Sequence, residues 1–253
     1  MKIDLSGRVA LVTGGGRGIG KAIALALAEA GADVAVNYRR DEDSALEVVK
    51  EIEALGRKAR AYQAAVENWD EDEKMVADVL RDFGHISILV NNAGIASRGQ
   101  SVADTDPAEM ERVVRVHAFG PHYLCKLVIP HMRKEGRGDI VMISSVATLG
   151  MGARGAPYNM GKAAMEALAL TLAKEERQHG IRANIVAPSL TVTEMGSRLI
   201  RATAGVQDIH ELDARSPFGR VSEPQDVAAA VTWLVSSANP YANGQKININ
   251  GGG

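Results

Sequence analysis

The chain has 253 residues, long enough for one large domain with a substantial buried core, and its 46% hydrophobic and 24% charged residues are an ordinary globular composition. A formal net charge of −2, without a run of lysines or arginines, gives no electrostatic case for nucleic acid or an anionic membrane as a partner. No apolar run approaches the ~20 residues that a membrane-spanning helix needs.

The start of the chain and its cysteine content bear on the compartment. Residues 1–7 contain no long apolar region and no cleavage-like segment, so no signal peptide is visible. The single cysteine, Cys125, cannot form a disulfide within the chain, and it has no neighbour at a metal-like spacing. A buried thiol used for packing is expected there. These features predict a soluble cytoplasmic protein without a metal site.

Strands and helices are predicted to alternate along the first part of the chain. Short apolar and β-branched runs predict strands over residues 8–13, 33–38, 58–66 and 86–90. Helical patterns lie between them, over residues 21–30, 44–55 and 70–83. Such regular alternation is typical of a parallel sheet that helices cover on both faces.

The second part of the chain continues this pattern. Residues 107–134 predict a long helix that Pro107 starts and that Gly120-Pro121 kinks or breaks. Residues 189–223 are predicted to be irregular, and the length of this stretch is typical of a lid or binding loop. Further strands are expected over residues 139–144, 181–187 and 245–250, and further helices over residues 156–179 and 224–236.

No linker or internal repeat divides the chain. The predicted fold class is therefore α/β: residues 1–253 form a single doubly wound Rossmann domain with a mainly parallel sheet, and residues 189–223 are a substrate lid within it. In such sheets, ligands bind beyond the carboxyl ends of the strands, where the strand order reverses.

A glycine-rich loop joins the first predicted strand to the first helix. The loop Thr13-Gly14-Gly15-Gly16-Arg17-Gly18-Ile19-Gly20 lies where a dinucleotide pyrophosphate belongs, because glycines let the backbone approach and a helix start offers N–H groups to anionic oxygens. The strict G-x-G-x-x-G spacing is not met, so a tight strand-to-helix turn is the alternative. The flanking strand and helix favour nucleotide binding.

The end of the second predicted strand indicates which nucleotide is bound. An acidic residue commonly holds the ribose 2′-OH there, but Asn37-Tyr38-Arg39-Arg40 contains no carboxylate. Arg39 and Arg17 are candidates to bind a 2′-phosphate through charge-assisted hydrogen bonds. One of the two adjacent arginines is expected to be a solvated surface charge, and Arg39 is the better candidate for contact. The predicted cofactor is NADP(H).

Two residues of the second long helix are candidates for acid–base chemistry. Tyr158 and Lys162 are four residues apart and therefore share one helix face. A nearby ammonium lowers the pKa of a phenol, which is ~10 when unperturbed, so Tyr158 could donate a proton to a carbonyl oxygen. Ser144-Ser145 ends a predicted strand, where a hydroxyl can hydrogen-bond a substrate oxygen. Taken singly, each residue could equally have a packing or capping role.

Together these motifs resemble those of the short-chain dehydrogenase/reductase family over nearly the whole chain. The glycine loop, Asn91-Asn92-Ala93-Gly94 and the ending 243–252 match the family's motifs in order and spacing. Ser145, Tyr158 and Lys162 match its catalytic serine, tyrosine and lysine. The resemblance implies a hydride transfer between a nicotinamide and a carbonyl or alcohol, and a homotetramer.

The resemblance also implies a role for each matching residue. Tyr158 would be the general acid/base, Lys162 would lower its pKa and bind the nicotinamide ribose, and Ser145 would orient the substrate oxygen. Thr193 would hold the nicotinamide carboxamide. The cofactor-binding residues expected in this way are Gly14, Arg17, Gly18, Ile19, Gly20, Tyr38, Arg39, Val66, Asn92, Ala93, Gly94, Tyr158, Lys162, Pro188 and Thr193.

The chain departs from the family pattern at three positions. His117 stands where an asparagine usually helps to relay protons to the lysine, so it either replaces that relay as a further catalytic residue or packs beside a changed helix bend. Ser189 replaces a glycine that usually follows Pro188. Ala65 replaces an acidic residue that commonly contacts the adenine, although Val66 can still pack on the ring.

Three functions are compatible with these residues. The pattern is most similar to 3-oxoacyl-carrier-protein reductases, which favours a ketone or 3-oxoacyl reductase that uses NADPH. An acyl carrier would be a partner in that case, and Arg133, Lys134 and Arg137 offer a basic patch for it. The alternatives are an NAD-dependent alcohol, sugar or steroid dehydrogenase and a non-catalytic dinucleotide sensor. The sequence leaves the identity of the substrate and the direction of the reaction open.

Overall fold

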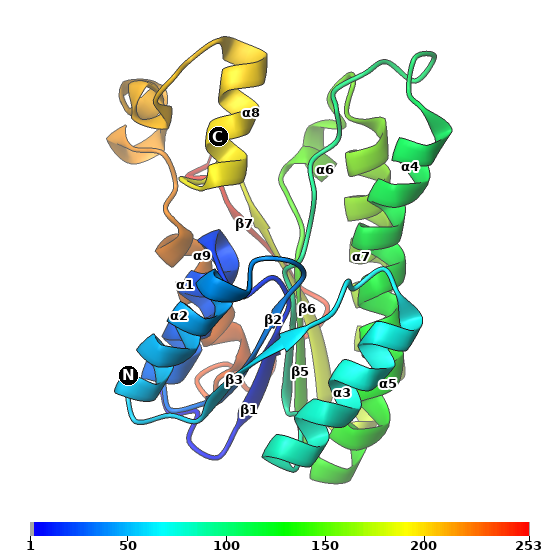
Figure 1. Ribbon diagram of the computed structural model, residues 1–253, viewed down its shortest axis with the longest axis vertical. Coiled ribbons are helices and arrows are strands. Elements are labelled where there is room, and N and C mark those ends of the chain that lie inside the picture. Colours follow the sequence, from blue (N-terminus) through cyan, green and yellow to red (C-terminus); the bar gives the residue numbers. More distant parts are fainter. Residues whose placement is uncertain (1–2, 253) are drawn as a thin grey trace.

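A parallel sheet forms the centre of the molecule (Figure 1). The computed structural model describes residues 3–252, so Met1, Lys2 and Gly253, including part of the predicted start of the chain, lie outside the described residues. Within residues 3–252, seven strands form one sheet in the order β3-β2-β1-β4-β5-β6-β7, and all neighbours are parallel. The strands are β1 (Val9–Val12), β2 (Asp33–Tyr38), β3 (Ala59–Gln63), β4 (Ile88–Asn91), β5 (Gly138–Ile143), β6 (Ile181–Pro188) and β7 (Lys246–Ile249). The predicted α/β fold class is confirmed.

Helices cover both faces of the sheet (Figure 1). The first face carries α1 (Gly18–Glu29), α2 (Glu42–Ala54) and α9 (Pro224–Val235). The opposite face carries α3 (Trp69–Phe83), α4 (Pro107–Val114), α5 (Gly120–Glu135) and α7 (Ala156–Glu175). The short α6 (Ala147–Gly150) and the helix α8 (Glu194–Ala204) lie beyond the upper edge of the sheet.

The sheet is buried on both faces because successive side chains of a strand point to opposite sides. In β1, Ala10 and Val12 belong to the core under α1, α2 and α9, whereas Leu11 belongs to the core under α3, α5 and α7. All three side chains are fully buried. Two apolar layers therefore explain why the strands are near-continuous apolar runs in the sequence instead of alternating ones.

The long helix over residues 107–134 is interrupted as predicted, but by a π-helical turn. Arg115–Phe119 forms this turn between α4 and α5, immediately before Gly120. A Cβ at Gly120 would lie 2.6 Å from the carbonyl oxygen of Val66, so only glycine allows this close approach to the end of β3. Pro121 lacks an N–H group, which removes one backbone donor at the same place.

The expectation that residues 189–223 are irregular is wrong. This stretch contains α8 and two 3-10 helices, Ile209–Arg215 and Pro217–Gly219. Thr193 and Asp208 accept hydrogen bonds from backbone N–H groups at the starts of the first two helices, and both are N-cap residues that the sequence displays. A small apolar cluster that includes Ile200 and Val221 holds the segment together.

The strand ends place the candidate residues. Because all strands are parallel, β1, β4, β5 and β6 deliver Thr13, Asn92, Ser144 and Pro188 to one edge of the sheet. The chain passes from β1 to β2 on one side of β1 and later crosses to β4 on the other side. This reversal of strand order creates the crevice in which doubly wound sheets bind their ligands.

A buried carboxyl group, that of Asp72, lies in the first turn of α3. Asp72 is fully buried, and among residues 3–252 neither of its side-chain oxygens has a hydrogen-bond partner. Burial raises the pKa of Asp72 to about 8, and the charges of Glu67 and Glu71 act in the same direction. In the unfolded chain an aspartate has a pKa of ~4. The folded state therefore holds this proton more tightly, and the protein loses stability as the pH rises through the interval between the two values.

We expect Asp72→Asn to remove this pH dependence, because asparagine has nearly the same size and does not ionise. At about pH 8 the variant should be more stable than the parent by ~1–3 kcal/mol, and at about pH 5 the difference should be much smaller. Urea unfolding at both pH values measures the effect. Asp70→Asn, at an exposed position of the same turn, is the control. A stability difference that is equal at both pH values would contradict the assignment.

Candidate active site

The glycine loop forms an uncapped helix start at the switch in strand order. Gly18 has φ +53°, in the left-handed region, and it begins α1. A Cβ at Gly20 would lie 2.1 Å from the carbonyl oxygen of Gly14, so the helix approaches the loop too closely for any side chain there. Arg17, the N-cap residue, makes no side-chain hydrogen bond to the helix. The first N–H groups of α1 are thus available to an anionic ligand such as a pyrophosphate.

The end of β4 locks this loop in place. Asn92 donates from Nδ2 to the carbonyl oxygens of Thr13 and Gly14 over 2.8 and 3.2 Å. In return, the Thr13 hydroxyl accepts hydrogen bonds from the backbone N–H groups of Asn92 and Ala93, each over 2.9 Å. Ile19 packs against the apolar core below. Asn92 and Ala93 therefore support the loop, and the residues present fit a dinucleotide.

The predicted phosphate-binding arginines are held in exposed ion pairs. Arg17 contacts Glu194 over 3.0 Å, and Arg39 contacts Glu67 over 2.9 Å. Their side chains remain 63% and 44% exposed, so they are accessible to a ligand. Arg40 is exposed, and within the described part of the chain it has no ion-pair partner. This agrees with the prediction that one of the two adjacent arginines is a solvated surface charge.

The other expected adenosine-side residues are more buried. Tyr38 belongs to the core and donates from its hydroxyl to Glu42 over 3.0 Å. Val66 is buried beside Gly120, and the N–H group of Ala65 donates to Glu71 over 2.7 Å. Glu71 thus contacts the backbone at position 65, where the family pattern leads one to expect an acidic residue.

The candidate serine, tyrosine and lysine come together from two elements. Ser145 follows β5, and its side chain lies close enough to Tyr158 on α7 to act on the pKa of the phenol. Lys162, one turn further along α7, is 3% exposed and donates from Nζ to the carbonyl oxygen of Ile143 over 2.6 Å. Its Nζ lies 5.7 Å from the centre of the Tyr158 ring. The structure thus brings together the three residues that the spacing argument selected.

Burial controls the ionisation of this group. It raises the pKa of Tyr158 above its usual value, and the hydrogen bond from Ser145 acts against this shift. Burial also lowers the pKa of Lys162 to about 7, while the negative charge of Glu166 acts to raise it. At neutral pH Tyr158 is therefore a protonated phenol, which suits a proton donor.

His117 packs edge-on against the candidate tyrosine, Tyr158. Its ring centre lies 5.2 Å from that of Tyr158 at an interplanar angle of 80°. Nε2 lies 2.8 Å from the carbonyl oxygen of Ile95 and 3.3 Å from the backbone nitrogen of the same residue. The shorter contact favours a proton on Nε2, which leaves Nδ1 as an acceptor. In the described part of the molecule, Nδ1 is buried without a partner. Burial lowers the pKa of His117 to about 3, so the ring stays neutral at physiological pH.

We expect the His117 ring to occupy space that Gly94 leaves free. A Cβ at Gly94 would lie 2.8 Å from Cε1 of His117, so Gly94→Ala should destabilise the protein by ~1–3 kcal/mol. The shorter side chain of His117→Asn should be tolerated and should recover most of that loss in the double variant. Melting temperatures of the four proteins measure this coupling.

Gly161 supplies the matched control for this cycle. A Cβ at Gly161 would lie 2.8 Å from the Cβ of His117, an atom that asparagine retains. His117→Asn should therefore not relieve the cost of Gly161→Ala. Additive costs for Gly94→Ala and His117→Asn would show that the imidazole does not fill the space beside Gly94.

The nicotinamide-side residues also reach the crevice. Pro188 ends β6 at the same edge as the serine. Thr193 caps the start of α8, and its Cγ2 would lie 3.3 Å from a Cβ at Gly18, so the two segments are neighbours. The helical segment after β6 therefore approaches the glycine loop directly.

Sequence reasoning missed a polar network behind the serine. Glu166, on α7, accepts hydrogen bonds from the hydroxyls of Ser144 and Thr148 and from Lys246 on β7. The available signal was the position of Glu166, four residues after Lys162 and therefore on the same helix face. Nothing in the spacing indicated Lys246, which the last strand brings to this place.

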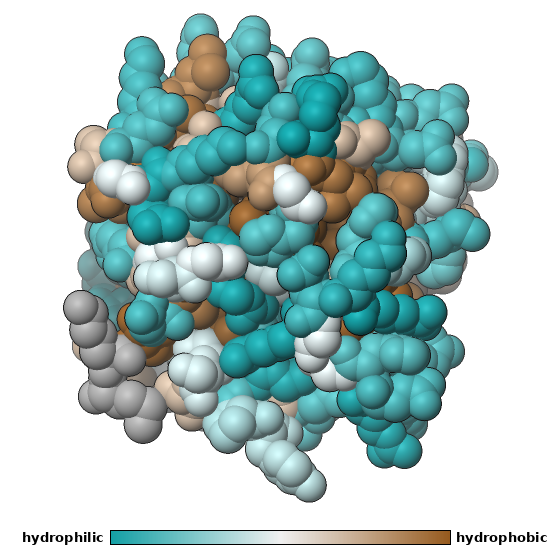
Figure 2. Space-filling view, turned by 90° about the horizontal axis from the view of Figure 1, so that it is seen from below, coloured by the Kyte–Doolittle hydropathy of each residue, from teal (hydrophilic) through white to brown (hydrophobic). Residues whose placement is uncertain are grey.

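The basic residues that were expected to bind an acyl carrier lie far from the candidate active site. Arg133, Lys134 and Arg137 lie before β5, at the opposite edge of the sheet from the serine that follows the strand. β5 has six residues, a length of ~20 Å. Arg133 and Arg137 are also engaged in ion pairs with Glu176 and Asp139. The face seen from below in Figure 2 is largely hydrophilic with scattered apolar areas, and it is not the face that carries the candidate site.

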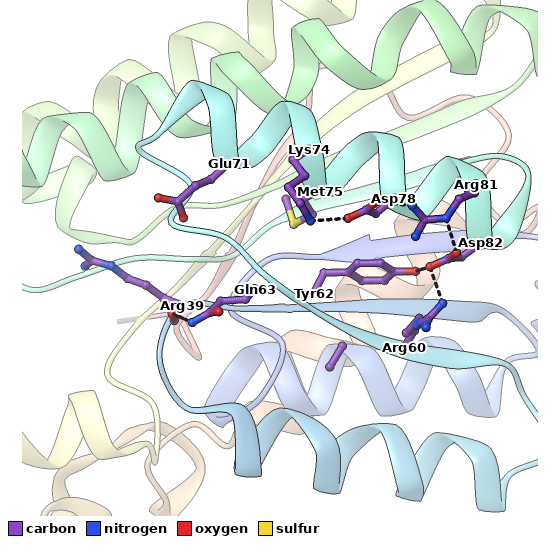
Figure 3. A pocket seen from close by; sticks show the side chains of 11 residues that line it. Arg39, Arg60, Tyr62, Gln63, Glu71, Lys74, Met75, Asp78, Arg81 and Asp82 are labelled. Carbon is purple, nitrogen blue, oxygen red and sulfur yellow. Dashed lines mark hydrogen bonds and ion pairs between the residues drawn. The ribbon is translucent and has the colours of Figure 1, made fainter.

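A groove of about 530 Å³ lies outside this crevice, between β3 and α3 (Figure 3). At one end, Asp82 forms ion pairs with Arg60 and Arg81 and accepts a hydrogen bond from Tyr62. Arg39 lies at the other end and points away from that cluster. Lys74 and Asp78 form a further ion pair in this groove, and the catalytic candidates do not line it.

Three further expectations concern the thiol of Cys125, metal binding and membrane-spanning helices. Cys125 is buried, and burial raises the pKa of its thiol to about 12, which confirms a packing role. Within residues 3–252, His, Cys, Asp and Glu side chains form no group of three or more that could hold a metal ion. The helices in the same range lack the combination of length and apolar character that crossing a membrane requires.

The fold and the crevice define a protein of the dinucleotide-binding Rossmann class. A family model described as Enoyl-(Acyl carrier protein) reductase matches residues 14–253. Versicolorin reductase 1 of Aspergillus parasiticus is 38% identical over 256 residues, which cover 98% of this chain and 97% of that protein. The 3-oxoacyl-(acyl-carrier-protein) reductase FabG of Staphylococcus epidermidis is 37% identical over 247 residues, 96% of this chain and 97% of that protein.

Solved structures agree with these relatives. A 7α-hydroxysteroid dehydrogenase complexed with NADH and 7-oxo glycochenodeoxycholic acid has a TM-score of 0.91 and 33% identity, covering 100% of this chain and 96% of that one. A short-chain dehydrogenase from Burkholderia cenocepacia J2315 in complex with NADP has a TM-score of 0.88 and 35% identity, covering 98% of both chains. The chain belongs to the short-chain dehydrogenase/reductase family. It is an oxidoreductase that acts on C=O and CH–OH groups with a nicotinamide cofactor.

Proposed function

We propose that the protein reduces a ketone to a secondary alcohol with NADPH, and that 3-oxoacyl thioesters are its leading substrate class. The observation that carries this proposal is the placement of Ser145 beside Tyr158, close enough to influence the pKa of the phenol, with Lys162 buried one helical turn away. The relatives that reduce versicolorin and 3-oxoacyl groups support the direction and the substrate class.

Tyr158, Ser145 and Lys162 each have a separate role in the proposed reaction. A bound nicotinamide supplies the hydride. The hydroxyl of Tyr158 donates its proton to the substrate carbonyl oxygen, and the Ser145 hydroxyl donates a hydrogen bond to the same oxygen as negative charge develops. Because burial raises the pKa of Tyr158, this residue carries the proton that reduction consumes at neutral pH. The Lys162 ammonium stabilises the phenolate that remains.

The glycine loop and its neighbours would hold the nucleotide. The uncapped start of α1 suits the pyrophosphate, and Thr193 lies beside Gly18 where it can reach the nicotinamide end. Arg17 and Arg39 supply two positive charges for a 2′-phosphate. Their ion pairs with Glu194 and Glu67 are exposed and worth ~0–1 kcal/mol each, so a doubly charged phosphate can displace the carboxylates.

Activity assays with purified protein test this function. We expect oxidation of NADPH in the presence of acetoacetyl-CoA or a related 3-oxoacyl thioester, with a higher kcat/KM than with NADH. A keto-steroid, a sugar-derived ketone and an enoyl thioester are the comparison substrates. A preference for NADH with an alcohol, sugar or steroid would favour the NAD-dependent alternative, which the NADH-bound steroid dehydrogenase illustrates. Measurable NADPH binding without oxidation across the panel would favour the sensor.

The proposal has three structural parts. Residues 189–223 act as the substrate lid, because Thr193, the N-cap residue of α8, lies beside the glycine loop, and the segment has a small apolar cluster of its own. The protein works in the cytoplasm, and an acyl carrier would approach the lid side of the sheet.

The protein assembles as a homotetramer. Light scattering of the purified protein tests this assembly, and a monomeric mass would contradict it.

A further inference from the structure

A buried polar network ties four elements together behind the candidate serine. Glu166 Oε1, on α7, accepts hydrogen bonds from the Ser144 hydroxyl over 2.5 Å and from the Thr148 hydroxyl over 2.8 Å. Lys246, on β7, donates from Nζ to Glu166 Oε2 over 2.9 Å and to the Thr148 hydroxyl oxygen over 2.6 Å. The Lys246 and Glu166 side chains are only 21% and 16% exposed.

The network reaches the serine through the turn after β5. The Thr148 hydroxyl oxygen also lies 2.8 Å from the backbone carbonyl oxygen of Ser145, so its single proton is shared between that carbonyl and Glu166, and Ser144 is the residue adjacent to Ser145. The Ser145 hydroxyl accepts a hydrogen bond from the N–H group of Ala147 over 3.1 Å, which is a further constraint on this turn. Glu166 therefore contacts a side chain on each side of Ser145 in the sequence, and Ser145 lies beside Tyr158.

The same carboxylate acts on the buried lysine. Glu166 lies one helical turn beyond Lys162 on the same face of α7. Burial acts to raise the pKa of Glu166, but hydrogen bonds from Lys246, Ser144 and Thr148 outweigh it, so the side chain is a carboxylate at neutral pH. Its negative charge opposes the loss of the Lys162 proton that burial favours.

Few other groups influence the charge of Lys162. Tyr158 and Glu166 face it from its own helix, neutral His117 faces it from the π-helical turn, and the carbonyl of Ile143 accepts its hydrogen bond from β5. Among these groups Glu166 is the one that is negative at neutral pH. It is thus the local charge that balances the buried ammonium.

We propose that Glu166 is a positioning residue for the reaction put forward above: it fixes the turn that carries Ser145 and places a negative charge near Lys162, so that the buried amine stays an ammonium. Lys246 anchors that carboxylate from the last strand. The proposal rests on the proposed function for its catalytic meaning, but the charge state of Lys162 can be measured without any turnover.

The first test is an NMR titration of the protein labelled with ¹³C at the lysine Cε atoms. Lys162→Met identifies the Lys162 signal. We expect the titration midpoint of Lys162 to fall by about one pH unit in Glu166→Gln, because the compensating charge is lost while the shape is kept. Lys246→Met leaves the carboxylate in place and removes a competing positive charge, so it should not lower the midpoint.

The controls separate this electrostatic role from a purely structural one. Glu175→Gln removes a charge from an exposed position of the same helix and should leave the midpoint unchanged. Glu166→Asp keeps the charge and should retain most of the parent value. Equal shifts in Glu166→Gln and Lys246→Met, or an unchanged midpoint in Glu166→Gln, would overturn the proposal whether or not the enzyme reduces ketones.

A kinetic measurement then connects the charge to the reaction. Glu166→Gln should lower kcat at neutral pH by about tenfold and raise the apparent pKa for alcohol oxidation, because a neutral lysine no longer stabilises the Tyr158 phenolate. The KM for NADPH should change less than kcat. A parallel loss of kcat at every pH, without a shift of the profile, would also count against the electrostatic role.

Discussion

Tyr158→Phe is expected to lower kcat for ketone reduction by ~10²–10⁴-fold and to leave the Kd for NADPH within about twofold of the parent value. The variant removes only the hydroxyl that would protonate the substrate. The phenyl ring can keep its edge-on contact with His117, whose ring centre is 5.2 Å away, so the local packing should persist. Steady-state kinetics and fluorescence titration with NADPH measure the two quantities.

Tyr241→Phe is the control for this substitution, because Tyr241 is 95% exposed and lies outside α7. It should retain the parent kcat. Activity of Tyr158→Phe within a few-fold of the parent would refute the assignment of Tyr158 as the proton donor. A large loss of NADPH affinity in that variant would instead indicate that the hydroxyl mainly helps to hold the nucleotide.

Simultaneous replacement of Arg17 and Arg39 by alanine is expected to weaken NADPH binding by ~10²-fold and to leave NADH binding within a few-fold of the parent. Hydrogen bonds to charged groups contribute ~1.5–3 kcal/mol each, and NADH lacks the phosphate that would receive them. Neither arginine side chain is part of the buried core, since both are substantially exposed. The fold should therefore remain intact. The ratio of kcat/KM for the two nucleotides measures the change.

Two single variants complete this test. Arg40→Ala removes an adjacent, exposed positive charge and should change the NADPH-to-NADH ratio little. Glu67→Gln releases Arg39 from its ion pair without removing the arginine, so it should not weaken NADPH binding. If the double alanine variant weakened NADH and NADPH equally, the arginines would serve the nucleotide in general and the predicted NADP(H) preference would be wrong.

The role of His117 could be predicted only in part from the sequence. The sequence left a proton relay and a packing role equally open. The ring does pack, against Tyr158 and into the space beside Gly94, and its Nε2 meets the carbonyl of Ile95. With a pKa of about 3, the ring can accept a hydrogen bond at Nδ1 but does not store a proton at neutral pH. A role of His117 in the relay stays a prediction.

The sequence pattern did not predict the surroundings of Tyr38 or the helices of residues 189–223. The prediction placed Tyr38 against the nucleotide, but its ring is buried in the core and its hydroxyl donates to Glu42. Within the interval 189–223, the two 3-10 helices are too short for a clear apolar period, whereas α8 has 11 residues and was missed. Their caps, Thr193 and Asp208, were visible signals that the pattern analysis did not use.

The doubly wound sheet, the edge at which the crevice lies and the candidates Ser145, Tyr158 and Lys162 could all be predicted from the residue pattern. These depend on local periodicity, on glycines at strand-to-helix turns and on side chains four apart on one helix, all of which neighbouring residues encode. Only the tertiary structure decided that Glu166 and Lys246 meet behind the serine and that the basic patch of residues 133–137 lies at the wrong edge. Such contacts join segments distant in sequence, and burial then sets their charge, so neither can be derived from spacing alone.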